Sequence, residues 1–238
     1  MQTAQKVSLW RNRDFLLLMS GQTISSVGSG ISDIAAPLLI LYLTHSPVQT
    51  GLAYALETLP FLLLSLLAGA LVDRWDRKRV MIVCDIARAL NLVTLFLAFF
   101  TGHLTLAQIY LNAFIEGVFT VFFSSAETAV ISQVVTRPQL AAGYATDQVL
   151  ANSASLIGPA LGGLLYGLAQ ALPFVVDAAS YVASFVALAC MKQPFQQVRT
   201  EARRRLLSEI GAGVSYLWRS PVFRFMAFYG AVLLGVLS

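Results

Sequence analysis

Charge is scarce in this sequence. Only 12% of its 238 residues are Asp, Glu, Lys or Arg, about half the share in an ordinary soluble domain, whereas 57% are hydrophobic. A soluble protein of this composition would expose large apolar patches, so we expect a protein that crosses a membrane several times. The formal net charge is only +4, and the basic residues stand in turns between apolar segments, which indicates no nucleic-acid partner.

Cysteine is scarce as well, and this limits the chemistry. The two cysteines, Cys84 and Cys190, have no His or carboxylate at metal-ligand spacing, so the sequence predicts no metal site and no disulfide. Neither a P-loop nor an HExxH motif occurs. Their absence excludes ATP hydrolysis by this chain and gives no reason to expect an enzyme or a bound cofactor.

Long apolar segments dominate what is present. A membrane span needs about 20 apolar residues, and six segments satisfy this: residues 15–43, 50–72, 80–101, 104–135, 140–169 and 174–191. They predict an all-α integral membrane fold with a six-helix bundle over residues 15–191. A polar arm (1–14) precedes the bundle, an amphipathic linker (192–220) follows it, and residues 221–238 begin a seventh apolar helix.

The basic residues predict which way the bundle faces. Every Lys and Arg except Arg88 lies in the arm, in the turns around 73–79 and Arg137, or in the segment 192–224. The turns at His45, His103 and Gln170 have none. Because positive loops stay in the cytoplasm, we expect a multi-pass protein of the cell (inner) membrane with a cytoplasmic N-terminus, arm and linker.

A charged turn between the second and third spans carries the first motif. It reads Gly-x-Leu-x-Asp-Arg-x-x-Arg-Lys-Arg, which resembles the signature between helices two and three of the major facilitator superfamily of transporters. The resemblance implies a gating role for Gly69, Asp73, Arg74, Arg77, Lys78 and Arg79. It also implies that Asp73 meets a helix of the opposite half of the transporter. One departure is Asp76, where most members have glycine.

The fifth span carries a second motif. Gly158 and Gly162 are spaced so that two helix backbones can approach closely, and Pro159 removes a backbone hydrogen bond. Gly158, Pro159, Gly162 and Gly163 together resemble the signature of the superfamily's exporters. Residues 176–181 and the linker are similar to the branch of macrolide-efflux proteins and enterobactin exporters.

This resemblance covers the whole chain and implies the N-terminal half of such a transporter. In that fold each half contains two inverted three-helix repeats, although the first three spans show no recognisable sequence similarity to the next three. The chain is then expected to be a fragment, with a missing C-terminal six-helix half as its partner.

Carboxyl groups inside the spans are the candidate working residues, because charge in a bilayer is costly and usually functional. Asp33, Glu57 and Glu116 lie well inside their segments. A desolvated carboxyl group can exchange a proton near neutral pH, and the resemblance places the first and fourth helices around the cavity. We therefore rank Asp33 first and Glu116 second as proton or substrate sites. For Glu57, hydrogen bonding within the bundle is the simpler interpretation.

Four further charged residues, Asp85, Arg88, Glu127 and Asp147, are predicted to form a network that fastens the cytoplasmic ends of the helices, with direct substrate contact as the alternative. One departure bears on coupling. Many proton antiporters of the superfamily place an arginine in the fourth helix, whereas Ala113 stands there in this sequence. Proton coupling by that route is therefore not expected.

The whole chain thus predicts a secondary active transporter in the lipid bilayer. The expected activity is proton-linked efflux of a hydrophobic or amphipathic small molecule of drug or siderophore type. A membrane subunit of an ATP-driven transporter is one alternative, against which the short basic turns argue. A non-transporting membrane scaffold is another, against which the intramembrane carboxyl groups argue.

Overall fold

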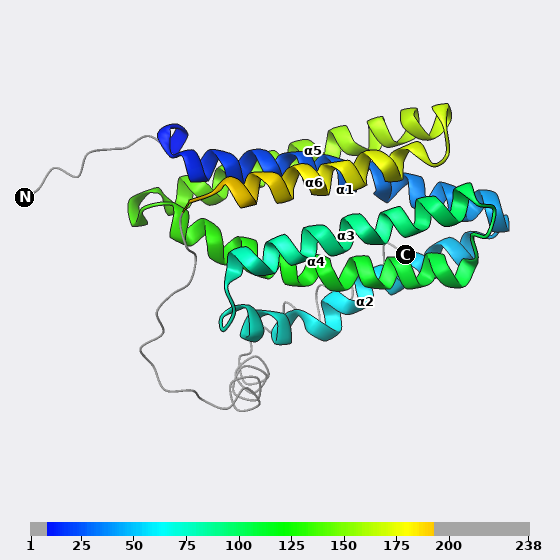
Figure 1. The fold of residues 1–238 in the computed structure, drawn as a ribbon, viewed down its shortest axis with the longest axis horizontal. Coiled ribbons are helices and arrows are strands. Elements are labelled where there is room, and N and C mark those ends of the chain that lie inside the picture. The colour runs from blue at the N-terminus through cyan, green and yellow to red at the C-terminus, as the bar shows by residue number, and fades with distance from the viewer. Residues whose placement is uncertain (1–8, 193–238) are drawn as a thin grey trace, which may run out of the picture. The chain divides into compact units, whose positions relative to one another are not determined.

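The computed structural model of the protein describes residues 9–192, which form a bundle of six long helices (Figure 1). They are α1 (Arg13–Thr44), α2 (Pro47–Val72), α3 (Arg77–Phe100), α4 (Leu106–Val134), α5 (Leu140–Leu168) and α6 (Leu172–Cys190), with short 3-10 helices η1 (Leu9–Arg11) and η2 (Arg137–Gln139). All six are long and apolar enough to span a membrane. Even α6, with 19 residues, extends about 28 Å, close to the thickness of the hydrocarbon layer.

The six predicted spans are confirmed, and no helix end differs from the prediction by more than three residues. Two helices begin earlier than predicted for a local reason. Pro47 stands in the first turn of α2, where the missing N–H is not needed. Asp76 caps α3, because its side chain accepts a hydrogen bond from the Arg79 N–H at 3.2 Å. The rest of the predicted linker and the seventh helix, residues 193–238, lie outside the described residues.

The helices pack in a symmetric order (Figure 1). Helix α1 packs against α5 and α6, α4 packs against α2 and α3, and α3 and α6 pack against each other. This pattern is unchanged when helices α1, α2 and α3 are exchanged with α4, α5 and α6. The packing is therefore that of two equivalent three-helix units, as the resemblance implies.

Glycines bring the backbones together in the two equivalent seams. Between α1 and α5, a Cβ atom at Gly158 would lie only 2.8 Å from the Gly30 Cα. Between α4 and α2, a Cβ at Gly117 would lie 2.0 Å from the Glu57 carbonyl oxygen. A proline lies close by in each seam, Pro159 in α5 and Pro60 in α2. These seams rest on backbone contact, which only glycine permits.

The fifth-helix motif is divided by this packing. Gly158 and Gly162 face α1, and a Cβ at Gly162 would meet the Ile31 carbonyl oxygen at 2.6 Å. In contrast, a Cβ at Gly163 would meet nothing within 4 Å. Two of the three motif glycines are therefore needed for helix packing within the described bundle.

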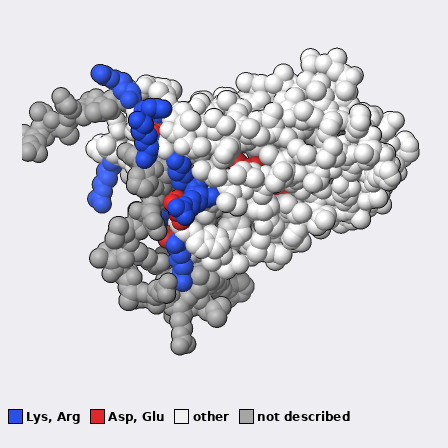
Figure 2. All heavy atoms as spheres, in the orientation of Figure 1, with Lys and Arg blue, Asp and Glu red and all other residues white. Residues whose placement is uncertain are grey.

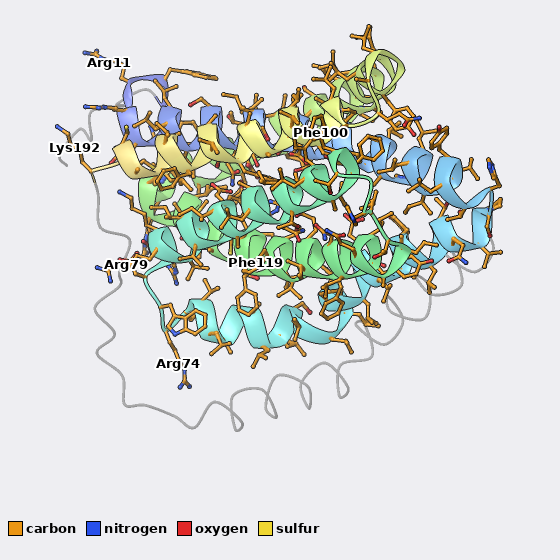
Figure 3. The ribbon with its side chains drawn as sticks, turned by 45° about the vertical axis from the view of Figure 1, so that its right-hand side comes forward. Arg11, Arg74, Arg79, Phe100, Phe119 and Lys192 are labelled. Atoms are coloured by element: carbon orange, nitrogen blue, oxygen red, sulfur yellow. The ribbon has the colours of Figure 1, made fainter. Side chains whose placement is uncertain are left out.

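The exterior is apolar along the helices and basic at one end. Large side chains such as Leu62 and Phe100 are 80% and 79% exposed, as expected for a surface that contacts lipid. Lys and Arg side chains gather at one end of the face that Figure 2 shows. Figure 3 places Arg11, Arg74, Arg79 and Lys192 at this end, which we call the basic end.

The glycine seams generate a first prediction. Gly117→Ala and Gly158→Ala should each lower the free energy of unfolding by about 1–3 kcal/mol, because the added methyl group meets backbone that cannot rotate away. Gly163→Ala is the matched control and should cost nothing, since alanine favours a helix and the space there is open. Thermal unfolding of the purified protein in detergent measures all three. Equal destabilisation by Gly163→Ala would contradict the packing.

Candidate functional site

A polar layer crosses the middle of the bundle. Buried apolar residues form two separate clusters, one that includes Phe15, Met81 and Val130 and one that includes Leu39, Leu92 and Phe174. On α3, Arg88 lies between the residues of the two clusters, about 16 Å along the helix axis from its first residue. The polar side chains around Arg88 therefore lie between two apolar regions.

An ion pair between α3 and α4 is the centre of this layer. The Arg88 Nε donates to Glu116 Oε1 at 2.5 Å, and the two side chains are only 8% and 15% exposed. The Arg88 guanidinium also lies over the ring of Tyr181 in α6, 4.2 Å from its centroid. A cation buried at this depth is stabilised by a counter-ion and an aromatic face together.

Further donors complete the surroundings of Glu116. The Tyr181 hydroxyl donates to Glu116 Oε1 at 2.7 Å and is 3.0 Å from the Ser29 Oγ in α1. Asn91 Nδ2 donates to the Asn112 carbonyl at 3.0 Å and reaches Glu116 Oε2 at 3.5 Å. Helices α3, α4 and α6 thus meet at one carboxylate, and α1 contacts two of its partners, Tyr181 and Arg88, through Ser29.

A cavity of about 110 Å³ adjoins the ion pair. Asp33 from α1, Glu57 from α2 and Asp177 from α6 line it, together with Arg88 and Glu116. The remaining lining is largely apolar and includes Ile40, Tyr54, Leu92, Leu95, Ile109 and Phe174. One guanidinium therefore shares a cavity with four carboxyl groups, among largely apolar walls.

The structure brings the three predicted candidates together. Asp33, Glu57 and Glu116 come from three different helices and line the same cavity. Sequence reasoning did not select Asp177 or Tyr181 as site residues. Asp177 could have been found by the rule used for the others, because it is an acidic residue inside an apolar span. Tyr181 carried no such signal, since its role depends on which helix α6 faces.

Of the four charged residues predicted to form a cytoplasmic network, Glu127 and Asp147 lie together in the described structure, whereas Arg88 does not pair with them. Arg88 pairs with Glu116 instead, because it lies at the middle of α3 and not near an end. Asp85, one turn away, is completely buried beside α6. Glu127 and Asp147 line a separate small pocket between α1, α4 and α5.

Other side chains fasten the basic end. The Lys78 ammonium donates to the Met191 carbonyl at 2.6 Å and so holds the end of α6. Asn12 Nδ2 donates to the Val134 carbonyl at 2.8 Å and links the start of α1 to the end of α4. Asp14 Oδ1 accepts from the Lys192 N–H at 3.3 Å. The fastening expected of the charge network is thus made by bonds between side chains and backbone.

Two ion pairs lie within the charged turn between α2 and α3. Arg77 Nη2 donates to Asp73 Oδ1 at 3.0 Å, and Arg79 Nε lies 3.5 Å from Asp76 Oδ2. Asp76 is the departure from the superfamily signature, and its capping of α3 gives that departure a structural role. A Cβ at Gly69 would meet nothing within 4 Å, so no described residue requires glycine there.

Six membrane-length helices in two equivalent units, with an ion pair and carboxyl groups around a central cavity, form the six-helix half-bundle of the major facilitator type. Comparison with known sequences agrees. The sequence profile of the transmembrane secretion effector family matches residues 5–237, and the chain therefore belongs to this family.

Known relatives include efflux proteins. The chain is 27% identical over 236 residues to the uncharacterized MFS-type transporter YfiS of Bacillus subtilis, covering 97% of this chain and 55% of that protein. It is 26% identical to the multidrug efflux pump Tap of Mycolicibacterium fortuitum (93% and 56% covered) and 27% identical to the enterobactin exporter EntS of Escherichia coli (92% and 52% covered). The chain spans about half the length of the curated relatives it matches.

The buried ion pair generates a second prediction. Arg88→Met should lower the free energy of unfolding by about 3–5 kcal/mol, because it leaves Glu116 buried without its counter-ion. The double variant Arg88→Met with Glu116→Gln should lose less than the sum of the two single variants. The control is Arg79→Met, whose side chain is 85% exposed and whose pair with Asp76 is worth at most about 1 kcal/mol. Equal losses at Arg79 and Arg88, measured by thermal unfolding in detergent, would contradict this account.

Proposed function

We propose that the chain forms one half of a proton-linked exporter of hydrophobic or amphipathic small molecules. The observation that carries this proposal is the cavity in the polar layer, where Asp33, Glu57 and Glu116 adjoin the one guanidinium of Arg88. Acidic groups within a membrane are costly and are kept where they move protons or bind substrate. The printed names of two relatives, a multidrug efflux pump and an enterobactin exporter, favour export as the direction.

Asp33 is the proposed site of proton exchange. Within the described residues its side chain is exposed at the cavity and has no ion-pair partner, whereas Glu116 is held by Arg88, Tyr181 and Asn91. A proton can therefore reach Asp33 without breaking an ion pair. Binding of the proton removes a negative charge from the cavity, and this charge change would be coupled to which side of the membrane the cavity faces.

Arg88 supplies the positive charge that the fourth helix lacks. Ala113, which occupies the place of the arginine of other antiporters, lines the same cavity as Arg88. The guanidinium enters this cavity from α3 instead, and it pairs with Glu116 three residues beyond Ala113 in α4. Proton coupling through an arginine and a carboxylate therefore remains consistent with this sequence, with the arginine on a neighbouring helix.

The wall of the cavity suits an amphipathic substrate. Tyr54, Ile40, Leu95 and Phe174 offer apolar contact, and the carboxyl groups offer polar contact. We further propose that the transporter lies in the inner membrane with the basic end in the cytoplasm. A second six-helix half would cover the cavity, and Asp73 in the charged turn would contact that half.

Asp33 generates the third prediction. Asp33→Asn should reduce export driven by a pH gradient to the background level, because the amide cannot take up and release a proton. Export is measured in inverted membrane vesicles that contain the complete transporter, with a lipophilic dye that the unchanged protein exports. Insertion should be unchanged, and the amount of protein in the membrane reports it.

A matched control lies on the same helix. Ser20 is exposed, and among the described residues its hydroxyl donates only to the Leu17 carbonyl, at 3.2 Å, so Ser20→Ala should export at the normal rate. Export by Asp33→Asn at the normal rate would overturn the assignment of Asp33. Export by the unchanged protein that persists without a pH gradient would overturn proton coupling itself.

The orientation generates a fourth prediction. In a variant without Cys84 and Cys190, a single cysteine at His103 should react with a membrane-impermeant maleimide in intact cells, because the α3–α4 turn would face outward. A single cysteine at Arg137, in the α4–α5 turn, should react only after the membrane is opened. The reverse pattern would show that the basic end faces outward.

A further inference from the structure

A second polar pocket lies apart from the central cavity. Gln22 of α1, Glu127 of α4 and Asp147 of α5 line it, and its volume is about 80 Å³. Met19, Thr23, Ser26, Leu150 and Ala151 complete the wall. A single water molecule needs only about 10–15 Å³ measured in this way, so the pocket can hold several.

Helix geometry relates this pocket to the central cavity. Glu127 follows Glu116 by eleven residues, and Asp33 follows Gln22 by the same number. Eleven residues make about three turns, so each pair shares one face of its helix, about 16 Å apart along the axis. The pocket therefore lies on the same faces of α1 and α4 as the central cavity, nearer the basic end.

The carboxyl groups of Glu127 and Asp147 face each other across this small pocket, each within reach of the other's charge. An ionised carboxylate only accepts hydrogen bonds, so a hydrogen bond between two carboxyl groups requires a proton on one of them. Two carboxylates in one small pocket also repel each other, and one shared proton removes the repulsion.

Gln22 offers independent evidence that the pocket binds something. Its side chain is only 7% exposed, and its amide nitrogen has no hydrogen-bond partner among the described residues. A buried donor without a partner is costly, and a water molecule or a reoriented carboxyl group in the pocket would satisfy it.

We propose that Glu127 and Asp147 share a single exchangeable proton, which makes their pocket a second proton-binding site between the central cavity and the basic end. Ser26 lines this pocket and Ser29 lines the central cavity, one helical turn apart on α1. These hydroxyls provide a polar route between the two sites. The use of the pair in transport rests on the proton-linked export proposed above, whereas the sharing of the proton does not.

The charged groups around Glu127 and Asp147 indicate that a proton, and not a basic side chain, compensates their negative charge. The further charge that acts on Glu127 from α3 is Asp85, which is also acidic. From α1 the pair is faced by Gln22, Thr23 and Ser26, which are uncharged. The cation in the middle of α3, Arg88, is paired with Glu116 at the central cavity.

Infrared difference spectroscopy tests the proposal directly. Spectra of the purified protein in lipid vesicles, recorded as the pH is lowered, resolve the carbonyl band of a carboxyl group that gains a proton. Glu127→Gln and Asp147→Asn should each abolish the band of the shared proton and replace it with the shifted band of the one carboxyl group that remains. The double variant, which has no carboxyl group in the pocket, should show neither band.

Two variants serve as controls. Gln148→Ala alters an exposed side chain next to Asp147 and should keep the band, and Glu116→Gln should keep it because that carboxylate belongs to the central cavity. Elution as a single species in size-exclusion chromatography verifies folding, and each single variant tests the pair should the other fail to fold.

Three results would overturn the proposal. They are two separate bands that add in the double variant, a band that survives both single variants, and loss of the band on adding sodium chloride at constant pH. The last would make the pocket a sodium site. No substrate or gradient is present in this experiment, so failure of the proposed export function would leave its outcome unchanged.

Discussion

A guanidinium in the middle of a bilayer needs a negatively charged group beside it, and this constraint determines the arrangement at the centre of the bundle. Arg88 is buried in α3, so α4 must supply Glu116, and α6 must turn Tyr181 toward both. Removing either charge alone leaves the other uncompensated in a region of low dielectric constant. The same requirement divides the apolar interior into two clusters, because the polar layer has to be continuous across helices α1, α3, α4 and α6.

The two three-helix units illustrate how a repeat can persist in packing and vanish from the sequence. Their shared requirement is a close approach of two backbones beside a proline, at Gly30 in one unit and at Gly117 in the other. Only one small residue is needed at each contact, and the neighbouring positions face lipid or different partners. The surrounding residues can therefore differ between the two units while the helix packing stays the same.

The number and the ends of the helices could be predicted from the sequence, because apolar length and basic turns follow from the cost of placing charge in hydrocarbon. The membership of Asp33, Glu57 and Glu116 in the site followed from the same rule. Their position around one cavity could not be predicted, since it depends on how three helices are rotated about their axes.

Arg88 is the clearest example of this limit. It was assigned to the cytoplasmic ends beside Glu127, although counting from the start of α3 places it at the helix centre, and its partner is set by the α3–α4 packing. The capping role of Asp76 could have been read from the turn itself.

The glycine seams also bear on how such a bundle can move. A contact between side chains can slide, because rotamers exchange at little cost, whereas a contact between two backbones has no part that can rotate. Helix α5 is therefore held rigidly against α1, and α2 against α4, so each pair should move as one rigid body. Any rearrangement of helices within this bundle must then take place where these rigid pairs meet α3 and α6, the two equivalent helices that pack against each other.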